Sequence, residues 1–235
     1  MMTLLFILIF VTLAALGLVS IINQVQKRER ARRMQQRQMR LQVELLEEVV
    51  DCLMQTLPDR QIAKHVNDEI LDLLQKILQL ERRNTTHIEA SIKYAETRGN
   101  ELVALKSRPR TSYLKDSDVQ IAQAQSHLNK AAQVLRHQHS LGRVSDEELD
   151  VYLNELSWAH LMVSAVSFIG QGYKASGRGD IFSAQAYYKK AQYLLIESTH
   201  SDPKRMRMIR ELGETIAGTR KVLSEDLMPE DAALL

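Results

Sequence analysis

The sequence predicts an all-α protein, with an apolar N-terminal helix followed by a bundle of further helices. Turn-forming residues are scarce, because the 235 residues include only nine glycines and four prolines. Average proteins contain about 7 % glycine and 5 % proline. No stretch alternates apolar and polar residues for long enough to indicate a strand. These observations favour long helices and argue against a β-sandwich or a β-barrel.

Residues 1–22 contain no charged side chain. About 20 apolar helical residues are enough to cross the hydrocarbon core of a bilayer. The segment has no basic residues before it and is longer than the apolar part of a secretory signal peptide. We therefore favour a retained transmembrane helix, and a cleaved signal peptide is the alternative.

A basic block directly follows this apolar segment, with seven Lys or Arg residues and one acid, Glu29, between residues 27 and 40. By the positive-inside rule, the block predicts a single-pass protein of a bacterial-type inner (plasma) membrane, with its N-terminus outside and its C-terminal domain in the cytoplasm. The residues expected to set this topology and contact lipid are Lys27, Arg28, Arg30, Arg32, Arg33, Arg37 and Arg40. We do not expect nucleic-acid binding, because no aromatic residues are interleaved for base stacking.

The next segment carries apolar residues at alternating steps of four and three, which is the spacing of a coiled-coil seam. The residues of this seam are Met39, Val43, Leu46, Val50, Leu53 and Leu57. Pro58 is expected to end the helix. The seam is a candidate surface for self-association into a homo-oligomer, and the face of an intramolecular bundle is the alternative.

Apolar periodicity and capping residues predict six further helices, over about residues 60–82, 84–105, 116–139, 145–176, 180–198 and 203–223. Ser145 and Glu148 form a capping-box pattern, and Pro203 suits a first helical position. Gly99 and Asn100 are expected to weaken or break the helix that contains them. The predicted organisation is an anchor (1–22), a juxtamembrane helical or coiled-coil segment (23–106), a linker (107–115), a C-terminal helical domain (116–223) and a flexible acidic tail (224–235).

One local pattern resembles a tetratricopeptide-repeat hairpin. Gly170, Tyr173 and Gly177 are followed by small, aromatic and small residues at steps of four and three, namely Ala184, Tyr188 and Ala191. In that family the small residues let two antiparallel helices approach and the aromatic ring fills the space beside them. The resemblance covers about 35 residues, and a generic helical hairpin is the alternative.

The resemblance also implies a place for partner proteins, since tetratricopeptide-like folds bind partners on their concave side. The candidate partner-binding residues are Tyr173, Tyr187, Lys189 and Lys190. We expect Tyr188 to pack inside the hairpin.

The sequence predicts no catalytic, cofactor-binding or metal-binding residue. The one cysteine, Cys52, lies beside acidic residues, and negative charge makes a thiol less reactive. His137 and His139 point apart on a helix and lack further ligands nearby. The predicted function is a membrane-anchored scaffold or adaptor without enzymatic activity. The alternatives are a structural accessory subunit of an inner-membrane complex and a membrane-tethered factor associated with nucleic acid.

Overall fold

The computed structural model of the chain describes residues 2–81, 85–104, 112–220, 223–224 and 226–227, and only the backbone of residues 2–22 and 25. This part of the chain folds into seven α-helices and contains no strand, which confirms the all-α prediction. The helices are α1 (Met2–Thr56), α2 (Gln61–Leu80), α3 (Thr86–Ala104), α4 (Asp118–Ser140), α5 (Asp146–Gly177), α6 (Ile181–Glu197) and α7 (Pro203–Ile216).

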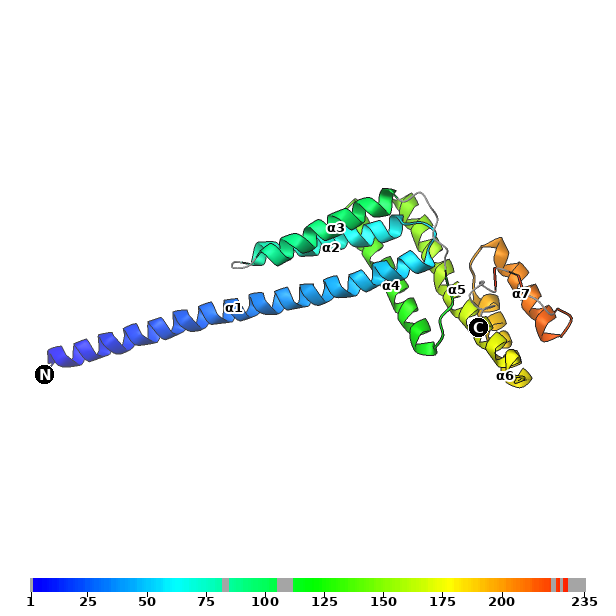
Figure 1. Cartoon of the computed structure of the whole chain (residues 1–235). Coiled ribbons are helices and arrows are strands. Elements are labelled where there is room, and N and C mark those ends of the chain that lie inside the picture. The colour runs from blue at the N-terminus through cyan, green and yellow to red at the C-terminus, as the bar shows by residue number, and fades with distance from the viewer. Residues whose placement is uncertain (1, 82–84, 105–111, 221–222, 225, 228–235) are drawn as a thin grey trace.

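The helices form a row in which each one packs against its neighbours in space (Figure 1). Helix α2 lies between α3 on one side and α1 and α4 on the other. Helix α5 packs between α4 and α6, and α7 covers another side of α6. The N-terminal half of α1 extends away from all the other helices, as Figure 1 shows.

Within the described part of the chain, no helix is long enough and apolar enough to cross a membrane. Even α5, with an uninterrupted buried run over 162–170, has the polar residues His160 and Gln171 beside that run. A bilayer core requires about 20 predominantly apolar residues. We therefore correct the predicted membrane-spanning helix, the single-pass topology and the inner-membrane location. The side chains of residues 1–22, on which that prediction was based, lie outside the described residues.

Most helix boundaries lie within a few residues of their predicted positions, and two predictions need correction. Helix α3 continues through Gly99 and Asn100, because the Gly99 backbone packs against the side chain of Asn67, which donates to the Ala95 carbonyl at 2.8 Å. Helix α7 ends at Ile216 rather than near residue 223, because Gly218 has a φ of +76°. That left-handed conformation is a common end to a helix.

The most deeply buried helix is α5, in which every residue from 162 to 170 is buried. The hydroxyl groups of its two buried serines, Ser164 and Ser167, are both hydrogen-bonded. Gln125 of α4 donates to Ser164 at 2.7 Å, and the Lys115 backbone N–H donates to Ser167 at 2.9 Å. The described part of the predicted linker therefore packs against α5, and residues 107–111 lie outside the described residues.

The predicted acidic tail is described at only three positions. Leu227 is fully buried, and Asp226 accepts hydrogen bonds from Lys204 at 3.3 Å and Arg207 at 2.6 Å. These three residues pack against α7, and the rest of the predicted tail lies outside the described residues.

Candidate functional site

The predicted seam on α1 lies in the core of a single chain. Its six residues, from Met39 to Leu57, are between 0 and 8 % exposed. Helices α2 and α4 pack against this part of α1. The structure therefore assigns the seam to the intramolecular face of the bundle. Self-association through the same residues stays a prediction, and it requires this face to open.

The basic block lies on the extended part of α1, where all seven Lys and Arg side chains are exposed. Arg40, nearest the bundle, lies 3.7 Å from the carboxylate of Glu81. The structure does not bring the seven residues together, because an α-helix turns by 100° per residue and spreads them around its surface.

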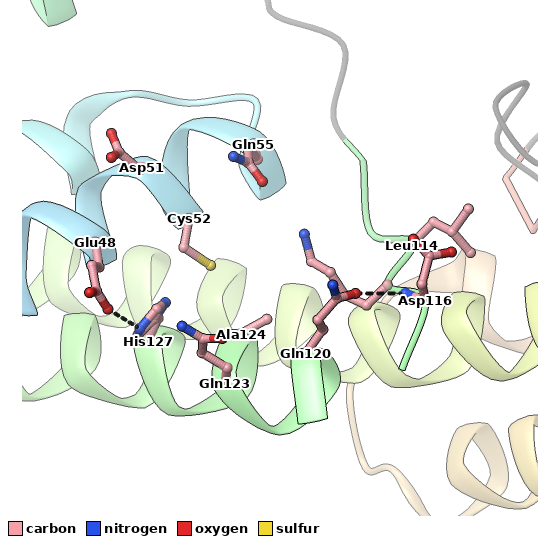
Figure 2. Close-up of a pocket in the computed structure, with 11 residues that line it drawn as sticks. Glu48, Asp51, Cys52, Gln55, Leu114, Asp116, Gln120, Gln123, Ala124 and His127 are labelled. Carbon is pink, nitrogen blue, oxygen red and sulfur yellow. Dashed lines mark hydrogen bonds and ion pairs between the residues drawn. The ribbon is translucent and has the colours of Figure 1, made fainter. Parts of the chain in front are cut away.

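A polar pocket of about 470 Å³ lies between α1 and α4 (Figure 2). Figure 2 shows Glu48 and Cys52 on α1 opposite Gln123 and His127 on α4. The segment that leads into α4 closes one end of the pocket. The lining residues are Glu48, Asp51, Cys52, Gln55, Leu114, Lys115, Asp116, Gln120, Gln123, Ala124 and His127.

The acidic groups of this pocket already have basic partners. Glu48 lies 3.5 Å from the imidazole of His127, and Asp51 is ion-paired with Arg98 of α3. Lys174 of α5 donates to Asp116 at 2.8 Å, and this hydrogen bond holds the pKa of Asp116 below its ordinary value. The pairs join the pocket walls to one another and to neighbouring helices, so the carboxylates serve to connect elements.

The Cys52 thiol is buried at the same pocket, and burial raises its pKa. A thiol with a raised pKa is protonated at neutral pH and is a poor nucleophile or metal ligand. Among the residues that the structure describes, no group of three or more His, Cys, Asp or Glu side chains is arranged to hold a metal ion. Burial therefore leaves the Cys52 thiol less reactive than an exposed thiol.

The α5–α6 hairpin, by contrast, carries exposed side chains that a partner protein can contact. Its turn uses Gly179 at a φ of +80°, and the Asp180 side chain caps α6 by accepting from the Ser183 N–H at 3.0 Å. The two helices approach closely at Gly172, where an added Cβ would lie 2.7 Å from the Tyr188 ring and 3.2 Å from the Ala184 carbonyl oxygen. This contact fixes which side of α6 faces the core.

The four predicted partner-binding residues lie on this hairpin in different environments. Tyr173 is 41 % exposed, whereas Tyr187 is half-buried and packs against the core. The ammonium of Lys190 lies 3.8 Å from the centre of the Phe168 ring, so it is engaged within the hairpin. Lys189 is exposed and makes no ion pair with any described residue.

Helix α6 exposes a row of residues at steps of four and three along the side opposite its buried residues. Its large apolar members are exposed: Phe182 is 86 %, Tyr193 59 % and Ile196 56 % exposed. We call this row the α6 stripe, and its residues are Phe182, Ala186, Lys189, Tyr193 and Ile196. Three of these, Phe182, Tyr193 and Ile196, were missed as sites from the sequence. The spacing that identified the α1 seam would also have found them.

The α6 stripe is carried on a well-anchored helix. Helix α5 packs on one side of α6 and α7 on another. Gln192 donates to the Ile209 carbonyl of α7 at 3.0 Å, and Arg205 donates to the carbonyls of Leu195 at 3.0 Å and Ser198 at 2.6 Å. The helix itself is therefore held in place, so that mainly its exposed side chains must become ordered when a partner binds.

Comparisons with protein families, with curated proteins and with solved structures find no match to this chain. The resemblance of the α5–α6 hairpin to a tetratricopeptide repeat therefore stays a prediction. The close approach at Gly172 is the kind of contact that the resemblance implies.

Proposed function

We propose that this protein is a non-catalytic adaptor that binds another protein through the α6 stripe. The observation that carries the proposal is the exposure of Phe182, Tyr193 and Ile196 on one side of a single anchored helix. Aromatic residues are enriched at the positions that contribute most to protein–protein affinity. An exposed apolar row with regular helical spacing fits a partner helix better than it fits a small molecule.

The polar pocket between α1 and α4 supports the non-catalytic part of the proposal. Its carboxylates are paired with His127, Arg98 and Lys174, and its thiol has a raised pKa. A nucleophilic thiol needs a lowered pKa, whereas burial raises the pKa of Cys52.

The test is affinity capture with the full-length chain and a stripe variant in which Phe182→Ser and Ile196→Ser are combined. A matched control combines Val119→Ser and Val151→Ser, since these residues are 76 % and 63 % exposed but lie outside the stripe. We expect the stripe variant to lose specific co-purifying proteins that the control retains. If the two variants and the original chain capture the same proteins, the stripe is not the docking surface and the proposal is wrong.

A further inference from the structure

We infer that the partner of the α6 stripe is an amphipathic helix that places an aspartate or glutamate against Lys189, between apolar residues. This inference rests on the proposed function and names the chemistry of its partner. It is carried by the position of one unpaired charge at the centre of an otherwise uncharged row.

The spacing of the stripe indicates a helical occupant. Phe182, Ala186, Lys189, Tyr193 and Ile196 repeat at four and three residues. This repeat keeps one side of a helix continuously against a partner helix that crosses at a shallow angle. The exposed apolar residues lie at both ends of the stripe, and the small Ala186 beside Lys189 leaves room for a side chain of the partner.

The charges around the stripe indicate an acidic residue on the partner. Lys190 is engaged over the Phe168 ring, and the neighbouring Glu197 raises the pKa of Tyr193. Lys189 makes no ion pair within the described part of the chain. A helix that covers the stripe removes the Lys189 ammonium from water, and an opposing carboxylate offsets that cost.

A second copy of this chain is the less suitable occupant. Two arrangements of two α6 helices cover the whole stripe of both copies. One is a parallel pair in register, and the other is an antiparallel pair centred on the middle of the stripe. Both place Lys189 opposite Lys189, because it is the middle residue of the row. Like charges placed together at an interface oppose association.

The test uses two synthetic peptides, each a three-heptad amphipathic helix, that differ only in a central glutamate or lysine. Binding to the full-length chain is measured by fluorescence anisotropy, and the binding site is located by hydrogen exchange of α6. We expect the glutamate peptide to bind at least about tenfold more tightly than the lysine peptide. Lys189→Glu should reverse this preference. The control variant Lys93→Glu, at another exposed lysine, should leave it unchanged.

Three outcomes would overturn the inference: equal binding of the two peptides, no binding of either, or an equal effect of Lys93→Glu. A dimer of the original chain that is lost in the stripe variant would also overturn it, because the occupant would then be a second copy. The capture experiment reports on the proposed function separately. If the stripe variant loses its partners while the two peptides bind alike, the adaptor function is supported and the inference of an acidic partner helix is wrong.

Discussion

The α1 seam and the α6 stripe have the same spacing of residues, but the seam is buried and the stripe is exposed. The seam residues are at most 8 % exposed, whereas Phe182, Tyr193 and Ile196 of the stripe are at least 56 % exposed. The seam consists of aliphatic residues and Met39, and the stripe has Lys189 at its centre. Heptad spacing thus shows that one side of a helix can pack continuously against a neighbour, but it does not show whether the same chain supplies that neighbour.

The difference arises from competition between the two sides of α6. The other side carries Ala184, Tyr188, Ala191 and Leu195, all of them buried. Ala184 and Tyr188 lie at the close approach to Gly172 of α5. If α6 instead turned the stripe toward α5, the Lys189 ammonium would lose its water without gaining a partner, which is costly. Helix α6 therefore turns its small and aromatic side inward and leaves the stripe exposed.

The largest expected effect comes from placing a carboxylate in each row. Val50→Asp should destabilise the fold by more than about 4 kcal/mol, because Val50 is fully buried in the seam and the new charge has no partner. Phe182→Asp should change the free energy of unfolding by less than about 0.5 kcal/mol. Urea denaturation of the two variants measures both values. Similar losses for the two would mean that the stripe is also part of the core.

The second prediction concerns the contact that orients α6. Gly172→Ala should cost about 1–3 kcal/mol, because the new methyl group meets the Tyr188 ring and the Ala184 backbone. Gly177→Ala, on the same helix, has open space around its Cβ and should be neutral or slightly stabilising. Thermal unfolding of the two variants tests this. If they behave alike, the close approach at Gly172 does not determine the orientation of α6.

The third prediction uses Cys52 to report whether the seam region stays closed. Alkylation of the native thiol should be at least about tenfold slower than that of the urea-unfolded chain, since the thiol is buried and its pKa is raised. Fast alkylation, or rapid formation of a disulfide-linked dimer from native protein, would instead show that the seam opens and is available for self-association.

The raised pKa of Cys52 also predicts a pH dependence of stability. Above the ordinary thiol pKa of about 8.5, the unfolded chain loses this proton while the folded chain retains it. Stability should therefore fall as the pH rises through this range. Cys52→Ala should show a smaller fall, as measured by urea midpoints at pH 7.5 and 9.5. An identical fall in both proteins would assign it to other groups.

The smallest expected change in stability is that of Lys189→Leu, which removes the one charge from the stripe. Its free energy of unfolding should change by less than about 0.5 kcal/mol, because the residue is exposed. The variant should self-associate, since the like-charge repulsion is gone and the row has become wholly apolar. Sedimentation equilibrium measures this association, with Lys93→Leu as the control. A monomeric Lys189→Leu variant would show that the charge is not what prevents self-pairing.

The sequence by itself determined the helices and most of their ends, because these depend on local interactions. Pro58 follows the end of α1, Ser145 and Glu148 form the predicted capping box at α5, and Asp180 caps α6. Each effect acts within a few residues along the chain and can be read from the residues concerned. The uninterrupted course of α3 through Gly99 and Asn100, where a weakened or broken helix was expected, depends on Asn67 of a different helix.

Only the tertiary structure decided which apolar rows are buried. The sequence identified the α1 seam correctly as a continuous face, but the presence of α2 and α4 against it depends on how the whole chain packs. In the same way, only the packing of the whole chain leaves Tyr187 half-buried, places Lys190 over the Phe168 ring and leaves Phe182 exposed. Burial is a property of the neighbours that a side chain meets, and residues distant in sequence provide most of those neighbours.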